Sequence, residues 1–296
     1  MCLMLPAPMT KPPPFAKSVR LLMMTPTQRI NQSPPFTDHA LPSFCGDSAL
    51  DTPRTAPDLP WVHTPTVQAL LERLLFVRAV RSSAAGYVQG LSDVAVPFVF
   101  VFLSESSLCM GLHPDGWAAR LSTLPARSPA LAAAEADAYG CFCALLDSIQ
   151  DQYTFAQPGV QRKAHTLGAL LRRLDAPLHA HLKSLGLDEP LVYAFRWINC
   201  LLQRELPFTL VPRLFDTYLS EGDAFPQFFT YVLVAFLTVW STQLRACPDF
   251  QSAVLVLQHP PTETWTVHDG QVAQLLGRAH QHRVTFAHAE RHLDLV

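Results

Sequence analysis

Two short groups of polar residues in the first third of the chain could act on an anion. Asp51 and Arg54 stand in a proline-rich stretch, so Arg54 is expected on a loop of restricted conformation rather than within a helix. Gln89 follows a run of small residues and directly precedes a long apolar segment. A helix in that segment would expose N-terminal backbone N–H groups, which favour anions such as phosphate. A loop guanidinium and an amide at a helix start are therefore candidate functional groups.

Simpler roles are favoured when these residues are considered one at a time. Arg54 then pairs with Asp51 inside its own loop, and Gln89 caps or hydrogen-bonds at the start of a helix. Asp51 is expected to orient the loop. Asp93 is expected to hydrogen-bond within its helix or to neighbouring backbone. The choice between the roles depends on the elements that position these residues.

Apolar residues recur at helical spacing through most of the chain after residue 64. Thr64 is a favourable N-cap and Pro65 a favourable first helical residue. Residues 87–103 are apolar on nearly all sides, which predicts a buried helix that Pro97 kinks or breaks. Further helices are expected at residues 130–150, 160–174, 177–185, 191–202, 211–218, 228–240, 250–257 and 267–289, with loops at 111–129 and 151–159. Alternating strand patterns are scarce, so we predict an all-α fold.

The composition favours one large apolar domain behind a proline-rich start. The 296 residues carry 24 acidic side chains against 22 Lys and Arg, a net charge of −2, and 49% are hydrophobic. This balance, without a Lys/Arg run, argues against nucleic acid as a partner. The longest nearly unbroken apolar run, residues 94–103, is about half of what a bilayer requires. We predict an irregular, disordered arm at residues 1–47, a helical domain at 48–290 and a tail at 291–296.

Cysteine and histidine spacing gives little support for a metal or redox site. Cys141 and Cys143 form a C-x-C pair, which is neither a redox pair nor a zinc half-site, so we expect buried, reduced thiols. His288 and His292 are four residues apart, but the glutamate that a zincin helix needs is misplaced. A helical metal enzyme is therefore a weak alternative. Other expectations concern packing: Trp197 and Trp240 in the core, and structural ion pairs among Arg196, Arg204, Glu205, Arg213 and Asp216.

In order and separation, the two polar groups resemble the two fingerprint motifs of the TBC-domain Rab GTPase-activating proteins. Asp51 and Arg54 match I-x-x-D-x-x-R, while Tyr87, Gln89 and Gly90 match Y-x-Q-G. Three later blocks resemble a Golgi-associated subgroup of that family: DQYTFAQPG at residues 151–159, FRWINCLLQRELP at 195–207 and RLFDTY at 213–218. The resemblance covers about residues 50–290 and implies the single helical domain of the family.

This resemblance implies a GTPase activator, not an enzyme with a substrate site of its own, acting on a Rab-family small GTPase in its GTP state. It implies that Arg54 is an arginine finger and Gln89 a glutamine finger that replaces the GTPase's own glutamine. An arginine supplied in trans accelerates hydrolysis by about 10³–10⁵-fold, because its permanent charge stabilises the phosphoryl transition state. Asp51, Tyr87, Gly90 and Asp93 would support the two fingers. The chain would have no cofactor or metal of its own, since the GTPase carries GTP and Mg²⁺.

The resemblance also implies a cytoplasmic protein, without a transmembrane segment, that is recruited peripherally to Golgi or other endomembranes. Some positions depart from the family pattern: Ser48 replaces Ile, Ser92 replaces Asn and Phe215 replaces Trp. The segment before Ser48 also lacks the Arg…Trp…Leu-Leu-Gly pattern with which the family domain opens, so we expect the family's first helices to be missing. The alternative is therefore a non-catalytic Rab-binding or scaffold protein on the same fold.

Overall fold

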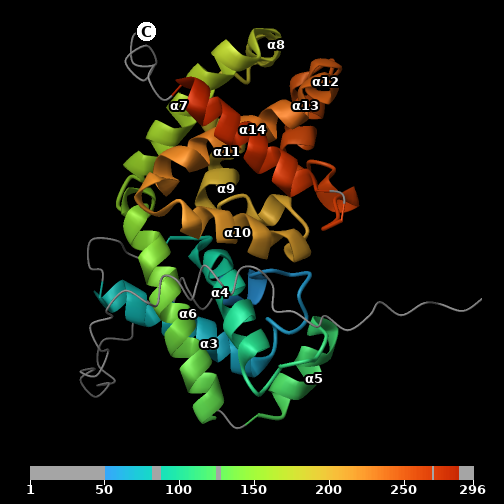
Figure 1. The fold of residues 1–296 in the computed structure, drawn as a ribbon. Helices are drawn as coiled ribbons and strands as arrows, with labels where there is room; N and C mark the ends of the chain where they lie inside the picture. The colour runs from blue at the N-terminus through green and yellow to red at the C-terminus, as the bar shows by residue number, and fades with distance from the viewer. Residues whose placement is uncertain (1–50, 82–87, 125–127, 269, 287–296) are drawn as a thin grey trace, which may run out of the picture.

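The computed structural model describes residues 51–81, 88–124, 128–268 and 270–286. These residues form α-helices joined by short 3₁₀ turns, with no strand among them, which confirms the predicted all-α fold. In Figure 1, one group of helices forms the lower half: α3 (Pro65–Arg81), α4 (Leu91–Glu105), α5 (Trp117–Ser122) and α6 (Pro129–Ser148). The upper half contains α7 (Pro158–Leu174), α8 (Ala176–Ser184), α9 (Leu191–Asn199), α10 (Val211–Ser220), α11 (Phe225–Val239), α12 (Ser241–Arg245), α13 (Phe250–Gln258) and α14 (Gln271–Phe286).

Each half is built around one helix that is apolar on nearly all sides. In the lower half this is α4, which packs against α6, and in the upper half it is α11, which packs against α14. Their buried side chains belong to one continuous hydrophobic core. Trp197 is fully buried with its ring centroid 5.2 Å from that of Phe236, and Trp240 stacks on Trp265. The expected core positions of Trp197 and Trp240 are thereby confirmed.

The segment Gly222–Val239 is long and apolar enough to cross a bilayer by length and composition alone. It exceeds the run at residues 94–103 that the sequence suggested as the longest. However, 61% of the segment is buried inside the fold, and α11 lies among the other helices of the upper half in Figure 1. Core helices of globular domains have this environment.

Several helix boundaries differ from those predicted. Thr64 accepts a bond from the backbone N–H of Val67 at 3.4 Å, as a residue at a helix N-terminus does. The expected loop at residues 111–129 contains the short helix α5, whose buried Trp117 and Leu121 stand four residues apart in a segment flanked by turn-forming residues. The helix predicted at 191–202 ends at Asn199, because Leu201 and Leu202 adopt left-handed backbone conformations with φ of +52° and +61°.

Of the two outcomes predicted for Pro97, a kink or a break, the break does not occur, since α4 continues through Pro97. Proline has no N–H, so the carbonyl of Asp93, four residues earlier, lacks its intrahelical donor. The side chain of Gln203 takes that place: its Nε2 donates to the Asp93 carbonyl at 2.7 Å from 110 residues away. The helix also starts later than expected, at Leu91 rather than residue 87. A contact between the two halves thus compensates a local defect in α4.

This compensation predicts an energetic coupling between Pro97 and Gln203. Gln203→Met leaves the buried carbonyl of Asp93 without a donor, which should destabilise the protein by about 1–3 kcal/mol. In a Pro97→Ala background, the new N–H at position 97 can bond to that carbonyl, so the same change should cost about 1 kcal/mol less. Urea unfolding of the four proteins of this double-mutant cycle measures the difference. Additive effects, equal to within about 0.3 kcal/mol, would contradict the explanation.

Candidate functional site

Arg54 lies at the end of a short 3₁₀ turn on the surface. The turn, η2 (Thr52–Arg54), buries Thr52, whose carbonyl accepts a hydrogen bond from Gln68 Nε2 at 3.1 Å. The hydroxyl of Thr55 donates to the Asp51 carbonyl at 3.2 Å and closes the loop. The guanidinium of Arg54 is exposed and forms no ion pair with any described residue, Asp51 included. The simpler interpretation, a local Asp51–Arg54 pair, is therefore not what the structure contains.

Gln89 is exposed in the turn that leads into α4. The next residue, Gly90, is buried with φ of +99°, a conformation that side chains other than hydrogen disfavour. A Cβ at Gly90 would also lie 3.1 Å from Cys200 Sγ, so the position requires glycine for two separate reasons. Tyr87, the remaining residue of this motif, lies outside the described residues.

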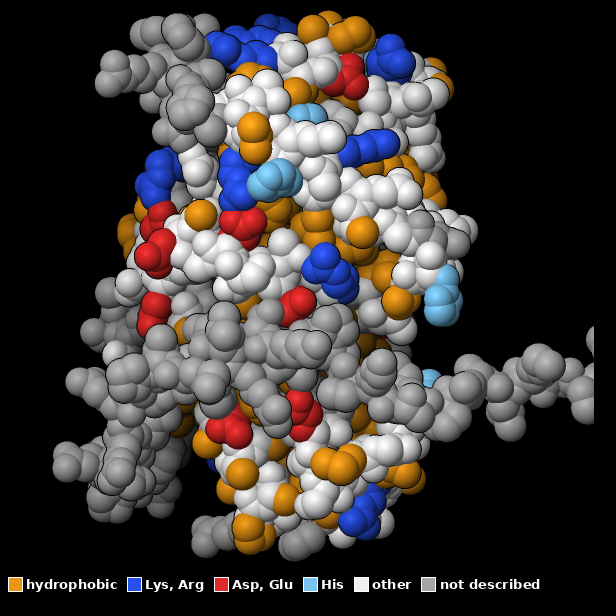
Figure 2. Space-filling view, viewed as in Figure 1, with side chains coloured by type: hydrophobic (Ala, Val, Ile, Leu, Met, Phe, Trp, Pro, Cys, Tyr) orange, Lys and Arg blue, Asp and Glu red, His pale blue; other side chains and the backbone are white. Residues whose placement is uncertain are grey.

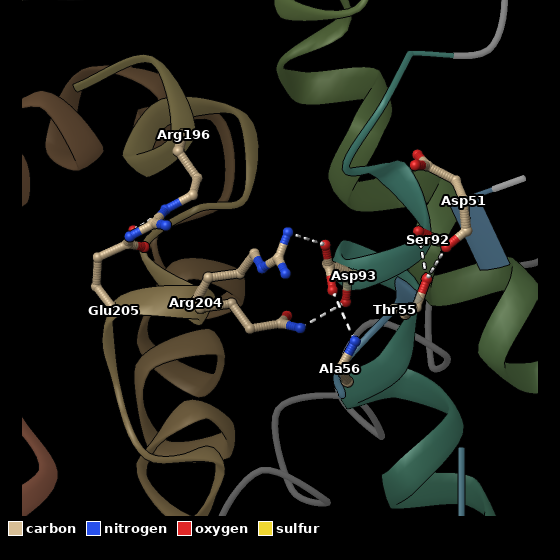
Figure 3. A network of polar contacts seen from close by, with 9 residues as sticks. Asp51, Thr55, Ala56, Ser92, Asp93, Arg196, Arg204 and Glu205 are labelled. Carbon is tan, nitrogen blue, oxygen red and sulfur yellow. Dashed lines mark hydrogen bonds and ion pairs between the residues drawn. The ribbon is translucent and has the colours of Figure 1, made fainter. Parts of the chain in front are cut away.

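Two hydrogen bonds join the Arg54 loop to the first turn of α4. Thr55 Oγ1 and Ser92 Oγ share a hydrogen bond at 2.7 Å, and the backbone N–H of Ala56 donates to Asp93 Oδ1 at 3.2 Å. Figure 3 shows these contacts side by side. Asp93 was expected to bond locally, but its partner is 37 residues away in sequence. The exposed side chains of Arg54 and Gln89 therefore emerge from the two edges of one hydrogen-bonded junction.

The carboxylate of Asp93 is buried, with 3% of the residue exposed. Burial raises the pKa of Asp93, while the positive charge of Arg204 and the N–H of Ala56 act in the opposite direction. Arg204 Nη1 lies 3.7 Å from Asp93 Oδ2, and Figure 3 shows Arg204 reaching Asp93 from the side opposite Ala56. Arg204 belongs to η5 (Gln203–Glu205), the turn that also supplies Gln203 to the Asp93 carbonyl.

A second buried carboxylate, that of Glu205, holds η5 against α9. Glu205 accepts from Arg196 Nε of α9 at 2.6 Å, and burial raises the pKa of Glu205 against the effect of Arg196. The expected Arg196–Glu205 pair is therefore present, but the other expected pairs differ: Arg204 contacts Asp93, and Arg213 donates to Thr217. Sequence reasoning missed Gln203 and Arg204 as parts of this junction. The signal available was Pro97, whose orphaned carbonyl requires a donor from elsewhere.

The described residues contain no group of three or more His, Cys, Asp or Glu side chains that could hold a metal ion. His288 and His292 lie outside the described residues. The described cysteines are free thiols, and burial raises the pKa of Cys109 to about 11 and that of Cys141 to about 12. Thiols with such pKa values are poor nucleophiles at neutral pH. On the face seen in Figure 2, acidic and basic side chains are interspersed and no basic band crosses the surface.

A family model and two sequence relatives agree on one domain family for this chain. The family model described as "Rab-GTPase-TBC domain" matches residues 45–245. TBC1 domain family member 22B of Homo sapiens is 40% identical over 243 residues, 82% of this chain and 46% of that protein. GTPase-activating protein gyp1 of Schizosaccharomyces pombe is 40% identical over 264 residues, 89% of this chain and 49% of that protein. The chain thus spans about half the length of these relatives.

A solved structure extends the similarity to three dimensions. The crystal structure of the Ypt/Rab-GAP domain of Gyp1p matches with a TM-score of 0.74 and 34% identity, covering 92% of this chain and 79% of that one. The TBC domain of a Chlamydomonas flagellar RabGAP, with a TM-score of 0.56 and 18% identity, shares the fold.

Replacing Gly90 should destabilise the junction more than replacing a comparable glycine elsewhere. Gly90→Ala combines a left-handed backbone with a 3.1 Å approach to Cys200 Sγ, whereas Gly111→Ala has φ of +77° and no atom within 4 Å. We expect about 1 kcal/mol for Gly111→Ala and about 2–3 kcal/mol for Gly90→Ala, measured by urea unfolding. Equal costs at the two positions would show that the contact with Cys200 is unimportant.

The raised pKa of Asp93 predicts a pH-dependent stability difference between the wild type and Asp93→Asn. The folded state holds the Asp93 proton more tightly than the unfolded state, so this contribution is full below the ordinary pKa of 3.8 and is lost as pH rises through the raised pKa. The wild type should therefore lose stability relative to Asp93→Asn between pH 4 and pH 7. Urea unfolding across this range checks it. A difference that grows in favour of the wild type would contradict the sign.

Proposed function

This chain belongs to the Rab-GTPase-TBC domain family, and we propose that it is a GTPase-activating protein for Rab-family small GTPases. The observation that carries the proposal is the junction itself: it holds two exposed side chains, Arg54 and Gln89, on hydrogen-bonded neighbouring segments. The relatives named above, one of them called a GTPase-activating protein, support the same activity.

In this proposal Arg54 acts as an arginine finger. Hydrolysis of GTP passes through a loose transition state in which negative charge spreads over the transferred phosphoryl oxygens and the leaving oxygen. A guanidinium placed there stabilises that charge and can contact two oxygens at once. Arg54 suits the task because it is exposed and has no carboxylate partner among the described residues, so it need not break an ion pair to reach a phosphate.

Gln89 acts as a glutamine finger. An amide can accept a hydrogen bond from the attacking water and donate one to the γ-phosphate, which aligns the water for in-line attack. The position of Gln89 depends on Gly90, since the left-handed Gly90 turns the chain into α4 directly after it. The bond from Ala56 to Asp93 and the bond from Thr55 to Ser92 fix this turn against the Arg54 loop. Geometric precision of this kind matters, because a misplacement of about 1 Å can cost about 10²-fold in rate.

The protein then works as an activator and takes no substrate into a pocket of its own. We propose that the GTPase brings the GTP and the Mg²⁺, and that this chain binds neither by itself. At the junction, the Asp93 carboxylate is buried and held by Ala56 and Arg204, which leaves it unsuited to coordinate a metal ion. The partner is the GTP-bound form, since both fingers act on the γ-phosphate. We place the encounter on the cytoplasmic side of endomembranes, as the resemblance of the sequence blocks implies.

The decisive experiment measures multiple-turnover GTP hydrolysis by a panel of purified Rab GTPases with this protein at catalytic concentration. The wild type should accelerate at least one of them. Arg54→Ala should lower kcat by about 10³-fold or more, the range for a removed arginine finger. Gln89→Ala should lower kcat by about 10²–10³-fold, as removal of one transition-state hydrogen-bonding group does.

Arg278→Ala is the matched control, because Arg278 is also an exposed arginine but lies on α14, away from the junction. It should retain wild-type kcat. Acceleration of no GTPase by the wild type would sink the proposal. Binding of a GTP-loaded Rab without acceleration would favour a non-catalytic scaffold instead. Full activity in Arg54→Ala would overturn the assignment of Arg54 as the arginine finger.

A further inference from the structure

Phe155 is almost completely exposed, at 97%, the highest value among the described exposed large hydrophobic residues. It stands at the tip of a tight turn in which the backbone N–H of Gln157 donates to the Thr154 carbonyl at 2.9 Å. This turn joins η4 (Gln150–Gln152) to α7. Exposing a large aromatic ring to water forgoes the free energy that its burial would provide.

The loop that carries Phe155 is anchored on both sides. Tyr153 is buried and its hydroxyl donates to the Asn199 carbonyl at 2.8 Å. The amide of Gln157 donates to the Gln152 carbonyl at 2.8 Å and to Asn199 Oδ1 at 3.0 Å. Arg162 closes the base of the loop with an ion pair to Asp151. Phe155 therefore lies on a loop that three hydrogen bonds and one ion pair hold in place.

The backbone of this loop is strained. Ala156 and Gln157 both have left-handed conformations, with φ of +60° and +45°, and each such residue costs about 1–2 kcal/mol. In the described part of the chain, the only other non-glycine residues of this kind are Ala56, Leu201 and Leu202. Strain of this sort tends to gather at functional sites. Here it is confined to the Arg54 loop, the Phe155 loop and the segment after α9 that links them.

A short path of contacts connects Phe155 to Gln89. Asn199, which holds the Phe155 loop through two hydrogen bonds, is followed directly by Cys200. The sulfur of Cys200 lies against Gly90, as the 3.1 Å approach of a Cβ there shows. Gly90 in turn follows Gln89. The Phe155 loop and the turn at Gln89 therefore rest on two adjacent residues at the end of α9, Asn199 and Cys200 respectively.

An open surface depression adjoins the Phe155 loop through Thr154. Its volume is about 500 Å³, and it is lined by Asp147, Ser148, Gln150, Asp151, Thr154 and Pro226. Its two carboxylates are already paired, Asp147 with Arg78 and Asp151 with Arg162. The depression therefore offers hydrogen-bonding groups without an uncompensated charge. An exposed aromatic side chain beside uncharged hydrogen-bonding groups resembles the aromatic-rich core and polar rim of protein–protein interfaces.

We propose that Phe155 is an apolar anchor for the small GTPase on which Arg54 and Gln89 act, an inference that rests on the proposed function. The partner would accept the ring in an apolar depression of its own surface. Stable interfaces bury about 800 Å² per partner and involve about 20–30 residues a side, so the contact surface extends well beyond the two fingers.

The experiment compares wild type, Phe155→Ser, Phe155→Leu and Met110→Ser against the GTPases of the panel above. Met110 is a matched control, since it is 66% exposed and follows the end of α4 opposite Gln89. Three quantities are measured: the Kd for each GTPase loaded with a non-hydrolysable GTP analogue, and the kcat and KM of stimulated hydrolysis. Thermal unfolding of each variant confirms that it is folded, which the exposure of both side chains leads us to expect.

Phe155→Ser should raise Kd and KM at least about tenfold and leave kcat within about twofold, the pattern of a lost docking residue. Phe155→Leu should recover most of the affinity, and Met110→Ser should bind like the wild type. Unchanged affinity in Phe155→Ser would overturn the inference while leaving the proposed function intact, as would equal losses in Phe155→Ser and Met110→Ser. Should the wild type bind GTPases without accelerating them, the proposed function fails but Kd still decides the role of Phe155. A wild type that neither binds nor accelerates overturns both.

Discussion

The first turn of α4 depends on one buried carboxylate residue that receives contacts from three directions. Asp93 accepts from the Ala56 N–H through Oδ1, lies against Arg204 through Oδ2, and accepts from Gln203 through its carbonyl. A buried charge is costly, and removing one partner from such a pair typically costs more than the pair contributes. Asp93 therefore ties the Arg54 loop, the start of α4 and η5 together as a unit whose members cannot be altered independently.

This arrangement also explains why Arg54 remains available. The two buried acidic residues of the junction, Asp93 and Glu205, are paired with other arginines, Arg204 and Arg196. A free guanidinium on a surface with net negative charge would ordinarily attract a neighbouring carboxylate, and such exposed pairs contribute little stability. Among the described residues, these pairings leave the exposed guanidinium of Arg54 without a carboxylate partner.

The periodic features of the fold were predictable, whereas long-range contacts were not. Helical spacing located most helices, and α5 was missed because it is only six residues long and flanked by turn-forming residues. Arg54 and Gln89 could be selected from their motifs, but their connection runs through pairs that are 37 and 110 residues apart in sequence. No local pattern encodes such pairs. The helix continues through Pro97 for a reason of the same kind, since a donor from the other half of the fold bonds the carbonyl that proline leaves without one.

The 110-residue separation between Asp93 and Gln203 also governs when the site can exist. Contacts distant in sequence require closure of a long loop and form after local helices. During synthesis, domains emerge from the N-terminus, so Arg54 and Gln89 leave the ribosome well before η5. Until Gln203 and Arg204 arrive, the first turn of α4 has an unpaired carbonyl and an uncompensated carboxylate. The nascent chain therefore contains both polar motifs before the contacts that fix their relative positions can form. The junction is complete only when the second half of the domain has folded onto the first.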